Sequence, residues 1–201
     1  MKEQNKEEPD FFIQLLLLGD ISVGKTSFIY HFLYNKFESN EMPTKELDLK
    51  TSDLVIENKN VRAQLWDTVG QEKYISITTN LILRVQGFII VYDITNKDSY
   101  ENVTKWINLV KEKCDKKVSI LVVGNKTDLE EQRVIKKDEA KKWCKNNKYK
   151  FIETSCLNGS NIKKAVTRIC KSIIHKQNFK KEISLSLSAS NLSENKKKHC
   201  C

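Results

Sequence analysis

The sequence predicts one α/β domain with a predominantly parallel six-stranded sheet, one antiparallel edge strand and helices on both faces. Short apolar runs alternate along the chain with segments whose apolar residues recur at helical spacing, the pattern of strands joined by crossover helices. With 201 residues, of which 39% are hydrophobic and 30% charged, the chain can bury the core of one domain and has little left for a second.

The first half of the chain predicts three strands and one helix. Residues 11–18 form a nearly continuous apolar run that ends before Gly19, which indicates a buried central strand. Residues 47–56 and 61–66 flank the polar turn 57–60, which predicts an antiparallel hairpin at a sheet edge. The helix lies between these segments, and its apolar positions are Phe28, Ile29, Phe32 and Leu33.

The second half predicts three further strands and three helices. The strands cover residues 88–92, 118–123 and 151–153. One helix is marked by Tyr100, Val103, Ile107 and Val110, and a second covers about 137–145. The last helix carries an apolar stripe formed by Ile162, Ala165, Val166, Ile169, Cys170 and Ile173. We expect this helix to end near Gln177.

Both ends of the chain are expected to be flexible, which leaves a domain over residues 10–177. Residues 178–201 are Ser-rich and basic, with no helical or turn pattern, and residues 1–9 are charged. The start also lacks an apolar secretory segment, which predicts a cytosolic chain whose cysteines stay reduced. We expect four of them to be buried thiols: Cys114, Cys144, Cys156 and Cys170.

The net charge of +9 admits three kinds of partner: nucleic acid, an anionic membrane surface, or phosphorylated ligands. Charge alone does not choose among them, because each attracts lysine and arginine. Over residues 176–201, six lysines against two glutamates leave a net charge of +4. Much of the excess charge therefore lies in the tail.

Residues 19–26, Gly-Asp-Ile-Ser-Val-Gly-Lys-Thr, fit the pattern G-x-x-x-x-G-K-[ST] between a predicted strand and a predicted helix. Glycines allow backbone N–H groups to surround phosphate oxygens, while the helix N-terminus and the Lys25 ammonium add positive charge. Thr26 supplies a hydroxyl for Mg²⁺. The expected nucleotide contacts are Gly19, Ser22, Val23, Gly24, Lys25, Thr26 and Ser27. This loop does not select the base, since ATPases and small-molecule kinases use the same cradle.

The base is selected by the segment Asn125-Lys126-Thr127-Asp128, which follows a predicted strand. Guanine presents N1–H and its 2-amino group as adjacent donors, and one carboxylate can accept both. Adenine has neither group in that position, so Asp128 would be left partly unpaired. A site built for hydrogen bonds rejects a ligand that lacks them by a factor of about 10⁴ or more.

The segment Asp67-Thr68-Val69-Gly70-Gln71 closes a predicted edge strand. A carboxylate at a strand end can hold magnesium through a water, as expected for Asp67. Gly70 can offer its N–H to a terminal phosphate, and Gln71 can orient a water. Gln71 and Lys25 are therefore the expected catalytic residues.

These residues resemble the Ras superfamily and, within it, the Rab family. The likeness covers roughly residues 10–177 and the terminal cysteines. Its motifs are WDTVGQEKY at 66–74, GFIIVYDIT at 87–95, GNKTDL at 124–129 and ETSC at 153–156. The resemblance implies a P-loop small GTPase domain that binds GTP or GDP with Mg²⁺.

The resemblance also implies further site residues. Thr44 would ligate Mg²⁺ only in the GTP form, beside Thr26 and the Asp67 carboxylate, which would hold the ion through a water. Phe37 would pack on the guanine face, and Lys126 would lie along the base. The loop of Ser155 and Cys156 would offer a backbone N–H to the guanine carbonyl. The expected guanine-loop residues are Asn125, Lys126, Asp128, Ser155 and Cys156.

Cys200 and Cys201, after Lys196 to Lys198, look like the Rab site for two geranylgeranyl groups. One lipid chain gives marginal, reversible membrane binding, and stable anchoring takes a second signal. Nearby lysines add roughly 1 kcal/mol each at an anionic leaflet. A disordered tail of about 22 residues would span about 25 Å, which lets the domain stay clear of the membrane.

The chain departs from the Rab pattern at three places. Ile21 stands where the family usually has a small residue, and Val69 replaces the usual alanine. Because both positions lie close to the hydrolytic water, we expect slow hydrolysis and an altered response to activating proteins. The third departure concerns partners: the expected effector patch of Leu49, Trp66 and Leu81 has aliphatic residues in place of two aromatic rings.

The resulting hypothesis is a lipid-anchored switch of vesicle trafficking at the cytoplasmic face of endomembranes, cycling with the cytosol. Its expected partners are an exchange factor, a GTPase-activating protein, a GDP-dissociation inhibitor, prenylation escort proteins and GTP-dependent effectors. We expect a monomer with no nucleic-acid partner. The alternatives are a scaffold locked in the GTP form and a P-loop phosphotransferase; the latter would need a substrate lid and a second basic pocket, and neither is visible in the sequence.

Overall fold

The computed structural model describes residues 8–38, 47–68, 80–114 and 118–197, with side chains described up to residue 179. Six strands form one sheet in the order β2-β3-β1-β4-β5-β6. Only the β2–β3 pair is antiparallel, and every other neighbouring pair is parallel. The predicted sheet, with its antiparallel edge strand, is confirmed.

The bounds of the elements follow the predicted runs closely. The strands are β1 Phe11–Leu18, β2 Asp48–Ile56, β3 Lys59–Asp67, β4 Gly87–Asp93, β5 Ser119–Asn125 and β6 Lys150–Glu153. The helices are α1 Lys25–Tyr34, α3 Lys97–Glu101, α4 Val103–Lys113, α5 Lys137–Asn146 and α6 Ile162–Lys197, with the 3-10 helix η2 at Thr127–Gln132.

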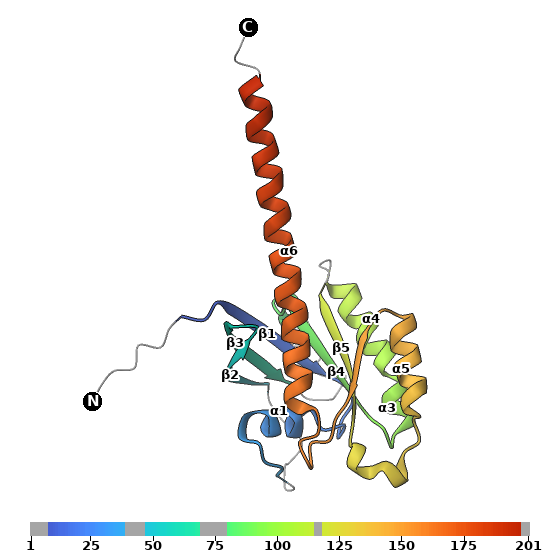
Figure 1. Ribbon diagram of the computed structural model, residues 1–201. Coiled ribbons are helices and arrows are strands. Elements are labelled where there is room, and N and C mark those ends of the chain that lie inside the picture. Colours follow the sequence, from blue (N-terminus) through green and yellow to red (C-terminus); the bar gives the residue numbers. More distant parts are fainter. Residues whose placement is uncertain (1–7, 39–46, 69–79, 115–117, 198–201) are drawn as a thin grey trace, which may run out of the picture.

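The core has two layers, one on each face of the sheet. Successive side chains of a strand point to opposite faces, so Leu15 and Leu17 pack with α1 and α6 while Leu16 and Leu18 pack with α4 and α5. Figure 1 shows this separation: α6 crosses one side of the sheet, and α4 and α5 lie beside each other, away from α6. Helices therefore cover both faces, as the apolar runs predict.

The turn of the edge hairpin is shorter than the polar segment 57–60. Glu57 and Asn58 both have positive φ, 52° and 58°, which is the conformation of a two-residue type I′ turn. Lys59 and Asn60 consequently belong to β3, where they pair with Ile56 and Val55. The hairpin places Leu49 directly opposite Trp66.

Two helices differ from the prediction. The helix expected around residues 100–110 is divided at Asn102, which ends α3 and begins α4. The last helix continues to Lys197 instead of ending near Gln177. Residues 178–197 contain no glycine or proline, so nothing in the local sequence breaks the helix. Within the part of the chain whose side chains are described, its buried residues end at Ile174.

The four cysteines outside the tail are free thiols. Cys144, Cys156 and Cys170 are buried, as expected, but Cys114 is only half-buried because it lies at the end of α4. Among the described residues, no helix combines the length and apolarity needed to cross a membrane.

Candidate functional site: a nucleotide-binding cradle

The phosphate-loop segment leaves β1 at Gly19 and enters α1 at Lys25. Gly19 has φ 143°, and a Cβ there would lie 2.2 Å from the Val91 carbonyl oxygen. Gly24 has φ 95°, and its Cβ would lie 2.4 Å from Nδ2 of Asn125. Both positions therefore require glycine for space as well as for conformation. Ser22 also has positive φ, 61°, although it carries a side chain.

Lys25 folds back over this loop. Its ammonium donates hydrogen bonds to the carbonyl oxygens of Gly19, at 2.9 Å, and Asp20, at 2.7 Å. The residue is only 5% exposed. Burial lowers the pKa of Lys25 to about 8, against the opposing effect of the Asp67 and Asp20 carboxylates. An anionic phosphate in the loop would give this ammonium the counter-charge it lacks.

Asp67 stands at the end of β3 and faces the start of α1. Burial raises the pKa of its carboxyl, while a hydrogen bond with Thr26 and the charge of Lys25 act in the opposite direction. Its Oδ1 is buried without a hydrogen-bond partner in the described part of the structure. Thr68 fixes the strand end by donating to the Leu17 carbonyl at 2.7 Å.

The pairing of Thr26 and Asp67 fits the expected Mg²⁺ site. The described residues contain no cluster of three or more His, Cys, Asp or Glu side chains that could hold a metal unaided. Mg²⁺ in nucleotide sites is commonly held by one or two protein groups together with phosphate oxygens and waters. The Thr26 hydroxyl and the unpartnered Asp67 oxygen match that kind of donor set.

Asn125 joins three segments of the site. Its Nδ2 donates to the Val23 carbonyl of the phosphate loop at 2.9 Å. Its Oδ1 accepts from the Thr154 hydroxyl at 3.1 Å and lies 3.3 Å from the Cys156 thiol. The residue is 1% exposed. In the structure the Asn125 side chain braces the loops against each other, and the nucleotide contact that the sequence indicates for it stays a prediction.

Lys126 is anchored by a residue that the sequence analysis does not single out. Its ammonium lies 2.7 Å from Oδ2 of Asp93, at the end of β4. The other oxygen of Asp93 accepts from the backbone N–H and hydroxyl of Thr95 at 2.8 and 2.7 Å. A carboxylate at the end of a buried parallel strand is the signal that could have identified Asp93, since ligands bind at that edge.

Asp128 and Ser155 lie against each other. The Ser155 hydroxyl donates to Oδ1 of Asp128, and it also accepts the Asn158 backbone N–H at 3.3 Å. Ser155 and Cys156 are buried, which fixes the loop after β6. The two segments predicted to recognise guanine are therefore held together by a side-chain bond.

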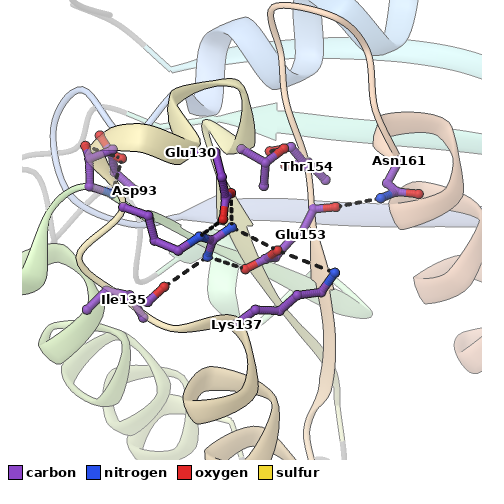
Figure 2. Close-up of polar contacts among 10 residues, drawn as sticks. Asp93, Glu130, Ile135, Lys137, Glu153, Thr154 and Asn161 are labelled. Carbon is purple, nitrogen blue, oxygen red and sulfur yellow. Dashed lines mark hydrogen bonds and ion pairs between the residues drawn. The ribbon is translucent and has the colours of Figure 1, made fainter.

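Near this loop, Arg133 connects Glu130 of η2 with Glu153 of β6. Figure 2 shows Glu130, Lys137 and Glu153 gathered around these contacts. The Arg133 guanidinium donates to Glu153 at 2.8 Å, to Glu130 at 2.7 Å and to the Ile135 carbonyl at 2.9 Å. Lys137 lies 3.8 Å from the same Glu153 carboxylate, which is buried. The Glu153 carbonyl in turn accepts from Asn161 at 2.9 Å.

Thr44, Gly70, Gln71 and the Val69 position fall outside the described residues. Phe37 follows α1 and is 43% exposed, and Ile21 is 50% exposed in the phosphate loop. Ser27 lies in the first turn of α1, which directly follows the phosphate loop.

The expected effector patch needs one correction. Leu49 is 37% exposed and Trp66 opposite it is half-buried, but Leu81 is only 9% exposed. Leu81 packs into the core layer that contains α4 and α5, because removing its apolar side chain from water is favourable. Of the three residues, Leu81 thus adds little to an exposed surface.

The sequence comparisons agree with this geometry. The Ras family model matches residues 14–175. Ras-related protein Rab-11C of Dictyostelium discoideum is 37% identical over 176 residues, covering 88% of this chain and 79% of the relative. The chain is a Rab-family small GTPase. GTP-binding protein ypt3 of Schizosaccharomyces pombe is 36% identical over 84% of this chain and 78% of its own length. Ras-related protein Rab-13 of Rattus norvegicus is 36% identical over 83% of this chain and 82% of its own length.

Membership defines the general activity of this small GTPase. It binds GTP and GDP with Mg²⁺, hydrolyses GTP, and acts as a GTP-binding switch in vesicle trafficking. Like other Rab proteins, it associates with endomembranes in a cycle with the cytosol and interacts with regulators and effectors.

Proposed function

We propose that this GTPase is a prenylated trafficking switch that recognises guanine through Asp128 and hydrolyses GTP slowly. The observation that carries the proposal is the bracing of Asn125 against the phosphate loop and the loop after β6. That bracing sets the phosphate-binding and base-binding segments at fixed positions relative to each other. A rigid site of this kind loses little free energy in ordering when the ligand arrives.

The proposed contacts follow the two ends of the nucleotide. At the base, Asp128 accepts from the two guanine donors, Lys126 lies along the ring where Asp93 holds it, and Phe37 covers the guanine face. A backbone N–H in the loop of Ser155 and Cys156 donates a hydrogen bond to the guanine carbonyl. At the phosphates, the proposed contacts are Gly19, Ser22, Val23, Gly24, Lys25, Thr26, Ser27 and Gly70. Thr26, Thr44 and Asp67 are the proposed magnesium residues.

Slow hydrolysis rests on bulk in the phosphate loop. Ile21 is half-exposed, which supports the view that its side chain occupies space where a water or an arginine finger would otherwise fit. Val69 is proposed to add to this crowding, while Gln71 retains the ability to orient a water. The same observation supports an alternative function, a binding scaffold that stays in the GTP form.

Membrane attachment is proposed to use Cys200 and Cys201 as acceptors of two geranylgeranyl groups. The support is the chemistry of the tail: two thiols follow three lysines, which favour an anionic leaflet. Prenylation escort proteins, a GDP-dissociation inhibitor, an exchange factor and a GTPase-activating protein are the proposed regulators. Leu49 and Trp66 form the proposed effector surface on a monomeric switch.

Base recognition is tested by calorimetry with Mg²⁺ for the wild-type chain and for Asp128→Asn. Wild type should bind GTP at least about 10⁴-fold more tightly than ATP, because only guanine satisfies the carboxylate. In the variant the amide presents one acceptor and one donor, which matches xanthine with its N1–H and 2-carbonyl. Xanthosine triphosphate should therefore bind the variant better than GTP. Equal binding of ATP and GTP by wild type would contradict the proposal.

Hydrolysis is tested by single-turnover release of γ-phosphate from the GTP complex. The variant Ile21→Ser with Val69→Ala should hydrolyse at least about tenfold faster than wild type if side-chain bulk costs about 1.4 kcal/mol in the barrier. Equal rates in the two proteins would refute the role of bulk. If the double variant hydrolyses GTP and wild type does not hydrolyse it at all, the result would favour the scaffold over the switch.

A further inference from the structure

Asp20, the second residue of the phosphate loop, bonds through its carboxylate to two residues at the start of α4. Its Oδ2 accepts a hydrogen bond from Nδ2 of Asn102 at 2.7 Å, and its Oδ1 accepts from the indole N–H of Trp106 at 2.8 Å. The Asp20 backbone carbonyl accepts from Lys25 at 2.7 Å. One residue thus links α4 to the lysine of the phosphate loop.

Both donors come from firmly held positions. Trp106, on α4, is 8% exposed and packs in the core layer that contains α4 and α5. Asn102 lies at the junction of two helices, where its backbone N–H donates to Asp98 and its carbonyl accepts from the backbone N–H of Trp106 at 3.1 Å. The same helical turn therefore presents both donors together.

The loop that they hold is under backbone strain. Ser22 has φ 61°, a left-handed conformation that disfavours a residue with a side chain. Such a conformation persists only where surrounding contacts over-determine the backbone. Lys25 and Asn125 restrain the loop through bonds to Gly19, Asp20 and Val23. Asn102 and Trp106 restrain it through two charge-assisted bonds to the Asp20 carboxylate.

We propose that Asn102 and Trp106 are positioning residues that hold the phosphate loop in its binding conformation through the Asp20 carboxylate, and so lengthen the residence time of bound nucleotide. They act through Asp20 and do not touch the phosphates. This inference rests on the proposed assignment of residues 19–26 as the phosphate-binding loop. Loss of the restraint lets the loop relax from its strained conformation, so nucleotide leaves faster.

The test uses the full chain with GDP and Mg²⁺, in four forms: wild type, Asp20→Ala, Trp106→Phe and the double variant. Trp106→Phe keeps an aromatic ring in the core and removes only the N–H donor. Displacement of a fluorescent GDP by excess GDP gives the dissociation rate. Trp106→Phe should release GDP about fivefold to tenfold faster, and Asp20→Ala at least as fast, with tenfold corresponding to about 1.4 kcal/mol.

The double variant separates positioning from general loss of packing. Because Asp20→Ala already removes the acceptor, adding Trp106→Phe should change the rate by less than about twofold. Multiplication of the two single effects would overturn the proposal, since it would mean that Trp106 acts through packing alone. Trp143→Phe on α5 is the matched control; its indole packs against Tyr149, and its rate should equal that of wild type.

A spectroscopic signature gives a second readout that stability does not move. The chain has three tryptophans, so nitrogen-15 spectra contain three indole N–H resonances. In the GDP complex the Trp106 resonance should move upfield in Asp20→Ala and move less in Asp20→Asn, which keeps an acceptor. An unchanged Trp106 resonance in Asp20→Ala would overturn the proposal. If wild type binds no GDP at all, the proposed function fails instead, which distinguishes the two failures.

Discussion

Lys25 illustrates how a single residue is prepared for an anionic ligand. Its ammonium is almost fully buried and bonded to two neutral carbonyls, so its charged form is poorly compensated. The nearby carboxylates of Asp67 and Asp20 only partly offset this cost, which is why the pKa falls to about 8. Bound phosphates reverse the balance by stabilising the charged form.

This balance predicts proton uptake when GDP binds. Near pH 8 about half of the Lys25 side chains are neutral in the free protein, and the phosphates should restore their charge. Because the GDP-bound state holds more protons than the free protein, the affinity for GDP should fall as pH rises through about 8. Calorimetry at pH 8 in buffers of different ionisation enthalpy should give an uptake of about half a proton per GDP. Lys25→Arg keeps its charge at this pH and should show no uptake; a zero value in wild type would refute the prediction.

At the scale of elements, the ion-pair network at Arg133 ties the 3-10 helix η2 to β6 and to the start of α5. The network has a buried half and an exposed half. Glu153 is 7% exposed at its side chain, whereas Glu130 is 66% exposed. A buried carboxylate that loses its partner remains desolvated, but an exposed one returns to water.

Two substitutions separate these halves. Arg133→Met should lower the free energy of unfolding by about 2–3 kcal/mol, at the lower end for a broken buried pair because Lys137 remains near Glu153. Glu130→Gln, the control, should leave stability almost unchanged because its carboxylate is exposed. Urea unfolding of the GDP complex measures both. Equal effects of the two changes would contradict the division into buried and exposed halves.

Local sequence pattern predicted most elements but few of the long-range contacts. The strands and α1, α5 and the packed part of α6 follow from apolar periodicity, since those residues face the core. Apolar periodicity does not predict the break at Asn102 or the 3-10 helix η2, because both depend on caps and turns. The ion pairs of Asp93 with Lys126 and of Arg133 with Glu153 join residues 33 and 20 positions apart, so no local pattern predicts either pairing. The glycines and Lys25 were found because their motif is contiguous.

At the scale of the whole molecule, the domain and the long end of α6 differ in what they bury. Side chains of α6 pack into the core as far as Ile173 and Ile174. Just beyond them, Lys176 donates to the Val118 carbonyl at 3.0 Å. Phe179, in contrast, is 63% exposed. This distribution supports a folding unit that ends near residue 177.

Removal of residues 178–201 should therefore leave the domain intact. We expect the free energy of unfolding to change by less than about 0.5 kcal/mol, because the buried residues of α6, where its side chains are described, end at Ile174. Ile173→Ala in the full chain provides the contrast and should cost about 2–4 kcal/mol through the cavity it leaves. Chemical denaturation with GDP and Mg²⁺ measures both proteins. A truncation as costly as Ile173→Ala would move the boundary further along α6.

The position of Asn125 has a consequence for how nucleotide is released. One amide side chain touches the phosphate loop and the segment after β6, so displacement of either segment breaks its bonds to this side chain. A protein that pulls on the segment after β6 would weaken the grip on phosphate at a distance. By reciprocity, loss of the phosphate grip loosens the base end by the same free energy. Unbinding can therefore start from either end of the nucleotide.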